Sequence, residues 1–214
     1  MFPPNTWCLD VEIANAIPDY KRPGFYFRPD IYYCKDWGDH AGMGIAVIVV
    51  ARPDDSDVRV FTGERGLRVP EKGYYDLLDF SRFLAEEARL LITYNGRMFD
   101  GKVLASKGFH IPPTRHLDFL FEIKQAIKQV APKGYKLEDV SLRCGGPKKT
   151  GQGAEAPILW QRGQKDTVIE YCKNDIKMTC ALARWYADNF ARLPSPDPLL
   201  HVQLRYPQEV MING

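Results

Sequence analysis

Three extended segments precede the first helical segment, and this order constrains the fold more than any other feature of the chain. Side chains alternate from Trp7 to Ile13, as they do in a half-buried strand. One face is apolar, with Trp7, Leu9, Val11 and Ile13, and the other carries Cys8, Asp10 and Glu12. Met43 to Ala51, rich in Ile and Val, predicts a buried strand, and Val58 to Thr62 predicts a third. Three consecutive strands before the first helical pattern can form an antiparallel meander.

The rest of the chain alternates between helical and extended patterns. Apolar residues at helical spacing predict helices, and the strand patterns between them are short. A capping box, Thr167 with Glu170, is expected at the start of the last helix. The predicted fold is therefore an α/β mixed sheet, with a three-stranded meander followed by parallel strands, flanked by helices. The predicted helices are Asp76–Ala88, Met98–Lys107, a helix ending near Val130, Lys136–Arg143 and Thr167–Phe190, and the further strands are Leu90–Tyr94 and His116–Asp118.

The length of 214 residues suits one such domain with a short appendage. Three prolines, Pro194, Pro196 and Pro198, break the helical pattern. We therefore expect a domain over 1–193 and a proline-rich tail over 194–214. Alternating apolar residues in the tail predict that it docks as an edge strand; they are Leu200, Val202 and Leu204.

Composition narrows the class of protein. The longest apolar run, Met43 to Ala51, is far shorter than the roughly 20 residues of a membrane span, so no membrane association is expected. No signal peptide is visible, which favours the cytoplasm, or the nucleoid for a DNA substrate. Five cysteines, an odd number without a C-x-x-C pair, argue against a disulfide framework or structural zinc. The net charge of +2 is near neutral, so only local charge could indicate nucleic-acid binding.

Four acidic residues stand out by their places in the predicted elements. Asp10 and Glu12 are two apart on one strand, so both carboxylates leave the same face. Asp100 lies early in the helix after the fourth strand, and Asp175 lies one helical turn after Tyr171. Carboxylates on apolar elements are costly without compensation, and Mg²⁺ prefers such oxygen ligands. Four carboxylates suit two Mg²⁺ or Mn²⁺ ions, which together can promote phosphodiester hydrolysis.

These residues resemble the motifs of a known family. Cys8-Leu9-Asp10-Val11-Glu12 resembles the first motif of the DnaQ-like (DEDD) 3′→5′ exonucleases, with a ribonuclease-H-like fold. Tyr94 to Asp100 looks like the second, and Tyr171-x-x-x-Asp175 matches the third in the tyrosine form (DEDDy) found in proofreading domains of family A and B DNA polymerases. The resemblance, over roughly residues 5 to 190, implies that Asp10, Glu12, Asp100 and Asp175 are metal ligands. It also implies that Tyr171 positions the attacking water and that nucleoside monophosphates are released.

Other residues are candidates for substrate contacts. Many relatives carry Thr where this chain has Ile13, a position whose backbone contacts the terminal nucleotide. The long stretch from Ala14 to Gly42 suggests a binding loop or lid, in which one or two aromatics serve as stacking platforms and most pack a small core of their own. His116 and Asp118 are expected to shape the site or cap the next helix. The predicted substrate-binding residues are Ile13, Asn95, Lys148, Lys149, Arg162 and Trp37.

The first interpretation is thus a metal-dependent 3′→5′ exonuclease on single-stranded DNA, with a possible replication or repair protein as partner. Three alternatives stay open at this point. The same site could serve an exoribonuclease, since 2′-hydroxyl recognition depends on pocket shape. The chain could instead be a non-catalytic nucleic-acid-binding or polymerase-accessory module, or an endonuclease of the ribonuclease H or resolvase type. The intact carboxylates argue against the second, and the Tyr-x-x-x-Asp helix argues against the third.

Overall fold

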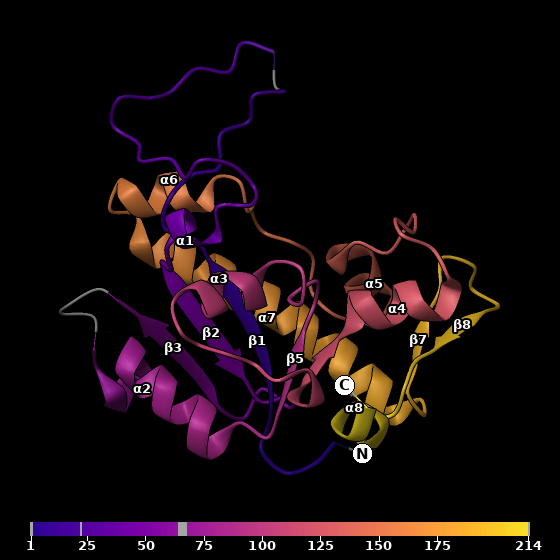
Figure 1. Ribbon diagram of the computed structural model, residues 1–214. Coiled ribbons are helices and arrows are strands. Elements are labelled where there is room, and N and C mark those ends of the chain that lie inside the picture. Colours follow the sequence, from indigo (N-terminus) through magenta and orange to yellow (C-terminus); the bar gives the residue numbers. More distant parts are fainter. Residues whose placement is uncertain (1, 22, 64–67, 214) are drawn as a thin grey trace.

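A six-stranded mixed sheet organises the molecule (Figure 1). Its first three strands are β1 (Thr6–Glu12), β2 (Val47–Ala51) and β3 (Val58–Thr62). They pair antiparallel in sequence, with Asp10 opposite Val49, so the predicted meander is confirmed. The computed structural model describes residues 2–21, 23–63 and 68–213.

Three shorter strands complete the sheet in the order β4-β3-β2-β1-β5-β6. Strands β5 (Leu90–Thr93) and β6 (His116–Asp118) run parallel to β1, as predicted. Strand β4 (Tyr74–Asp76) runs parallel to β3 and was not predicted. The mixed α/β architecture expected from the sequence is confirmed.

Helices cover both faces of this sheet (Figure 1). The long helix α7 (Lys165–Asp188) packs across β1 and β2 on one face, together with α4, α5 and α6. Helices α2 and α3 cover the other face. The shorter helical segments are α1 His40–Met43, η1 Pro70–Lys72, α2 Leu77–Arg82, the π-helical turn η2 Phe83–Glu87, α3 Asp100–Ser106, η3 Pro113–Arg115, α4 Phe119–Ile127, α5 Leu137–Arg143, α6 Ala156–Gln161 and α8 Pro207–Asn213.

Strand β1 divides its side chains between the two cores. Trp7, Leu9 and Val11 are buried against α2 and α3, where Trp7 meets Phe83 edge-on. Cys8 is buried on the α7 face. Because side chains alternate along a strand, Asp10 and Glu12 leave β1 on that same α7 face. The acidic face of the strand therefore lies under the helix that carries Tyr171 and Asp175.

Two helical predictions need correction. The helix predicted from Thr167 begins at Lys165, with Gln164 as N-cap and no side-chain cap bond, so the expected capping box is wrong. Helix α6 was not predicted. Its apolar residues Ala156 and Trp160 are buried by tertiary contacts, which a segment this short does not signal.

Part of the tail forms a strand, in a small sheet apart from the six-stranded one. Strand β8 (His201–Gln203) pairs antiparallel with β7 (Arg192–Pro194) in a separate two-stranded sheet. Arg205 binds Glu122 of α4 with two hydrogen bonds, of 2.9 and 2.6 Å. The tail therefore packs against α4, while the division at residue 194 stays a prediction. Among the described residues, no helix has the length and apolar character that crossing a membrane requires.

Candidate metal centre

The carboxylates of Asp10 and Glu12 lie near the C-terminal end of β1, on the face of the sheet that α7 covers. Glu12 is 8% exposed, and Asp10 is half-buried. Their neighbours on β2 are Val47 and Val49, both fully buried, so the two acids stand on an apolar sheet surface. Such a position costs free energy unless a cation or hydrogen bonds compensate it.

Asp100 joins these two residues from the start of α3. Its Oδ1 accepts a hydrogen bond of 3.2 Å from the backbone N–H of Val11, the residue between Asp10 and Glu12. Asp100 is 6% exposed. This bond fastens the first turn of α3 to β1, so three carboxylates from segments 90 residues apart are held together.

Asp175 and Tyr171 approach from α7, one turn apart and both buried. Oδ2 of Asp175 pairs with Nζ of Lys149 at 2.9 Å. Oδ1 of Asp175 is buried and has no hydrogen-bond partner among the described residues. A buried carboxylate oxygen without a partner is rare in folded proteins and indicates a missing ligand.

The four acids repel one another electrostatically. Burial, and then the charge of Asp175, raise the pKa of Asp10 to about 7. Burial and the neighbouring carboxylates also raise the pKa of Glu12 and of Asp100 well above their usual ranges. Burial raises the pKa of Asp175, although Lys149 opposes that rise. The charges of neighbouring carboxylates thus contribute to the raised pKa of Asp10, Glu12 and Asp100, as is expected of acids that lie near one another.

This cluster fits divalent cations by two observations. Its donor atoms are carboxylate oxygens, the ligands that Mg²⁺ and Mn²⁺ prefer. Lys149 supplies one positive charge beside four acids, and an oxygen of Asp175 is left without a partner. The residues that could hold the cations are Asp10, Glu12, Asp100 and Asp175.

Tyr171 borders this cluster with its phenol. Burial, followed by the charges of Asp175, Glu12 and Asp10, raises the pKa of the Tyr171 hydroxyl far above its usual value. The hydroxyl therefore stays protonated at neutral pH and can donate a hydrogen bond.

Cys172 is a member of the site that the sequence did not indicate. The buried Cys172 thiol donates a hydrogen bond to Oδ2 of Asp10 at 3.2 Å. Ligand atoms of Asp10, Glu12 and Cys172 lie within 4.8 Å of one another. The spacing Cys172-x-x-Asp175 on one helix was a usable signal, because residues three apart share a face.

A loop rich in glycine lies against the ring of Tyr171, a contact that the sequence did not indicate. A Cβ on Gly151 would meet Cδ2 of Tyr171 at 2.7 Å, closer than real contacts allow. A Cβ on Gly153 would lie 3.5 Å from the Tyr171 hydroxyl, an ordinary contact. Lys149, two residues before Gly151, brings its ammonium to 5.2 Å from the centre of the same ring. The segment between α5 and α6 thus closes one side of the site.

Asp118 organises the loop between β5 and α3. Its Oδ1 accepts from Asn95 N at 2.9 Å, and its Oδ2 accepts from Arg97 N at 2.8 Å. It also accepts from Phe121 N, so it is the N-cap of α4. His116 lies within hydrogen-bond distance of Thr93. The expected shaping and capping role of Asp118 is confirmed, whereas Asn95 does not cap α3, which has no side-chain cap bond.

The predicted substrate-binding residues are dispersed. The side chain of Ile13 is buried in the core, so only its backbone could reach a ligand. Trp37 is 69% exposed and packs at 6.1 Å against Phe99, the neighbour of Asp100. Arg162 pairs with Asp30 at 2.8 Å. Lys148 is exposed, and Lys149 pairs with Asp175.

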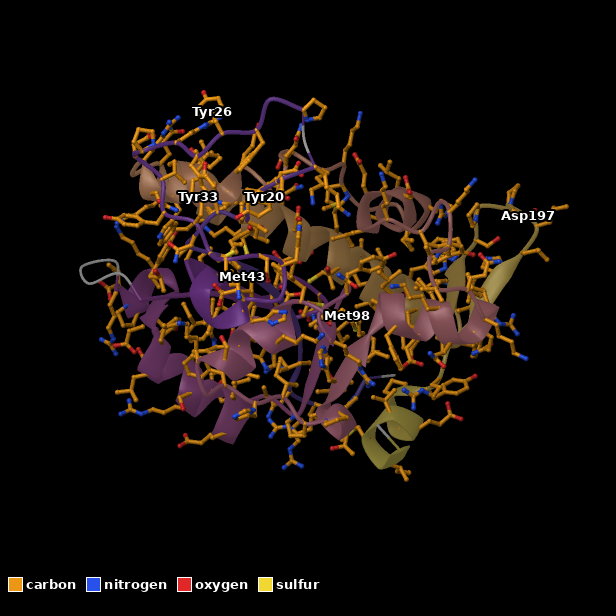
Figure 2. All side chains as sticks on the ribbon, turned by 45° about the horizontal axis from the view of Figure 1, so that its top comes forward. Tyr20, Tyr26, Tyr33, Met43, Met98 and Asp197 are labelled. Carbon is orange, nitrogen blue, oxygen red and sulfur yellow. The ribbon has the colours of Figure 1, made fainter. Side chains whose placement is uncertain are left out.

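The loop between β1 and α1 projects beyond α6 (Figure 1). Four of its rings, Tyr20, Phe25, Phe27 and Tyr33, pack edge-on against one another, and Figure 2 shows Tyr20, Tyr26 and Tyr33 gathered there. Gln161 of α6 fastens the base of the loop, with bonds to the backbone of residues 14 and 32. The four rings contact one another, but none of them is buried, so they do not form the small core that was expected. More rings are exposed than the one or two predicted: Tyr20, Tyr26, Phe27, Tyr32 and Trp37.

Comparison with known families gives a match over most of the chain. The family model described as RNase_H superfamily matches residues 39–187. That range contains Asp100, Tyr171 and Asp175, and it begins after β1. No curated protein sequence matches the chain.

Among solved structures, the fold is similar to the family B DNA polymerase from the hyperthermophilic archaeon Pyrobaculum calidifontis. The TM-score is 0.57 and the sequence identity is 17%. The match covers 87% of this chain and 25% of the polymerase chain, so the protein spans about a quarter of that polymerase's length. A likeness at this identity concerns the fold.

Proposed function

The chain belongs to the RNase H superfamily, and from that membership we propose that it is a metal-dependent 3′→5′ exonuclease acting on single-stranded DNA. Members of such a fold differ in chemistry, so the function has to be argued from the site. One observation carries the proposal: Asp10, Glu12, Asp100 and Asp175 converge from β1, α3 and α7 beside Tyr171. The order of these residues is that of the tyrosine branch of DEDD exonucleases.

The four carboxylates would hold two Mg²⁺ or Mn²⁺ ions. Bound divalent ions supply a water of lowered pKa and stabilise the attacking and leaving oxygens of a phosphodiester. The chain's own contribution is to hold the carboxylates in one place. The bond from Val11 to Asp100 joins β1 to α3, and the buried face of α7 fixes Asp175.

Tyr171 orients the attacking water by donating a hydrogen bond from its phenolic hydroxyl. Its raised pKa keeps it protonated, which favours donation over proton removal. Lys148 and Lys149 follow α5 at the edge of the cluster and would contact phosphates of the substrate. Trp37, exposed beside Phe99, would stack on an unpaired base near Asp100.

The test uses a single-stranded DNA oligonucleotide labelled at its 5′ end and an RNA of the same sequence. Each is incubated with the protein and Mg²⁺, Mn²⁺ or EDTA. We expect a ladder that shortens from the 3′ end, requires metal and releases nucleoside monophosphates. Faster shortening of the RNA would identify an exoribonuclease with the same site.

Two variants complete this test. Glu12→Gln should lower the cutting rate more than about 100-fold, because it removes a carboxylate that would bind metal. Loss of a group that only hydrogen-bonds to a metal ligand already lowers metal affinity or activity about 10–100-fold. Glu86→Gln, at an exposed position of η2, is the matched control and should cut like the wild type. Binding of both oligonucleotides without any shortening would contradict the proposal and favour a non-catalytic module.

A further inference from the structure

A basic cavity with a volume of about 610 Å³ lies beside the loop that leads to Asp100. Its lining residues come from the end of β5, from α4 and from the connection between α4 and α5. Three of its lining residues are lysines, and none of those described is acidic. The lysines are Lys124, Lys133 and Lys136, and the other residues used below are Tyr94, Asn95 and Tyr135.

The ammonium groups of these three lysines are the charged groups among the described lining residues of the cavity. Within the described parts of the chain, none of them takes part in an ion pair. Lys133 and Lys136 are exposed, and Lys124 is half-buried. Like charges around one hollow repel one another, and an anionic ligand would relieve that repulsion.

A second lysine-lined cavity gives the contrast. It contains Lys72, Lys173 and Lys177, but Asp55 and Glu170 line it as well. Lys173 pairs with Glu170 at 2.8 Å. Acidic residues thus share the second cavity with its lysines, whereas no acidic residue of the described chain lines the first.

The cavity is connected to the carboxylate site by the chain segment from Tyr94 to Asp100. The Tyr94 hydroxyl donates to the carbonyl of Tyr135, which joins two of its walls. Asn95 lines its rim, and the chain continues from Asn95 through a loop held by Asp118 to Asp100 at the start of α3. A nucleic-acid strand whose 3′ end lies at the carboxylates would therefore pass this rim within a few nucleotides.

We propose that this lysine cavity binds the phosphate backbone of the substrate strand, a few nucleotides from the 3′ end held at the carboxylates. The inference rests on the proposed function and adds the path of the strand. Lysine contacts of this type are ionic and independent of base sequence. Their signature is a dependence of affinity on salt, with a slope of about −0.7 per phosphate contact for single strands.

The experiment measures the affinity for a fluorescent single-stranded DNA between 50 and 200 mM salt, in EDTA so that nothing is cut. Removing two phosphate contacts with Lys124→Ala/Lys133→Ala should flatten the slope of log affinity against log salt by about 1.4. Lys124→Arg/Lys133→Arg should restore it, because the charges return. Lys72→Ala/Lys173→Ala, from the cavity that Asp55 and Glu170 also line, is the matched control and should keep the wild-type slope.

The outcomes separate the two proposals. An unaltered slope in Lys124→Ala/Lys133→Ala, or an equal flattening in the control, would overturn the cavity as a strand path even if the protein cuts DNA. The expected flattening in a protein that never cuts would support the path and overturn the exonuclease. A slope that stays flat in the arginine variant would show that a lost contact other than charge is responsible, and would also overturn the proposal.

Discussion

The ammonium of Lys149 lies 2.9 Å from Oδ2 of Asp175, so the carboxylate cluster contains a positive charge from the chain itself. The same lysine opposes the rise in the pKa of Asp10 and of Glu12. When no metal is bound, Lys149 would be the counter-charge nearest Asp175, and the stability of the acid cluster would depend on it. The following predictions start from this arrangement.

Replacing Lys149 should destabilise the metal-free protein. Lys149→Met leaves Asp175 without its partner, and loss of one side of a charged hydrogen bond costs about 1.5–3 kcal/mol. The control is Lys148→Met, because Lys148 is exposed and forms no ion pair in the described chain. Urea unfolding in EDTA measures both; equal midpoints for the two variants would contradict the role given to Lys149.

Tyr171→Phe should slow cutting without loss of metal binding. The phenol is the proposed donor to the attacking water, and such groups contribute about 10²–10⁴-fold to a rate. The ring itself packs among buried residues of α7 and is retained in the variant. Single-turnover rates together with Mn²⁺ titration test this. Weaker Mn²⁺ binding at an unchanged rate would remove Tyr171 from the chemistry.

Two neighbouring glycines should differ sharply in their tolerance of a methyl group. Gly151→Ala puts a Cβ 2.7 Å from the Tyr171 ring, so the ring or the loop has to move, and cutting should fall at least about tenfold. Gly153→Ala meets the Tyr171 hydroxyl at 3.5 Å and should be tolerated. If both variants cut alike, the loop does not position Tyr171.

The stability of the metal-free protein should fall as pH rises from 6 to 8. The pKa of Asp10 is about 7 in the folded protein and near 3.8 in the unfolded chain, so folded protein holds the proton more tightly. The resulting stabilisation is complete below about pH 4 and is lost as pH rises through 7. Asp10→Asn should flatten the dependence, and Mg²⁺ should remove it for the wild type. Identical pH profiles in EDTA for the wild type and Asp10→Asn would contradict this prediction.

The strands and the motif positions were accessible from sequence because they follow local patterns. Alternation along β1 predicted that Asp10 and Glu12 share one face. The apolar run of β2, which contains their partners Val49 and Val47, predicted a buried strand. Strand β4 was missed, since Tyr74–Asp76 is three residues long and is a strand through its pairing with β3. These residues form a strand because they pair with β3, not because their own sequence has a strand pattern.

The contacts that close the site were not predictable. Lys149 reaches Asp175 and Gly151 reaches Tyr171 because of the path that the loop takes between α5 and α6. No periodicity marks such a path. For the same reason the sequence did not indicate that Lys149 pairs with Asp175 or that Arg162 pairs with Asp30.

A crystal structure of the protein with Mn²⁺, analysed by anomalous scattering, tests the central claim most directly. The account predicts manganese peaks among Asp10, Glu12, Asp100 and Asp175, and an Asp175 that no longer depends on Lys149 for its counter-charge. The absence of manganese from these carboxylates at millimolar metal, with Lys149 still paired to Asp175, would contradict the metal centre and the exonuclease built on it.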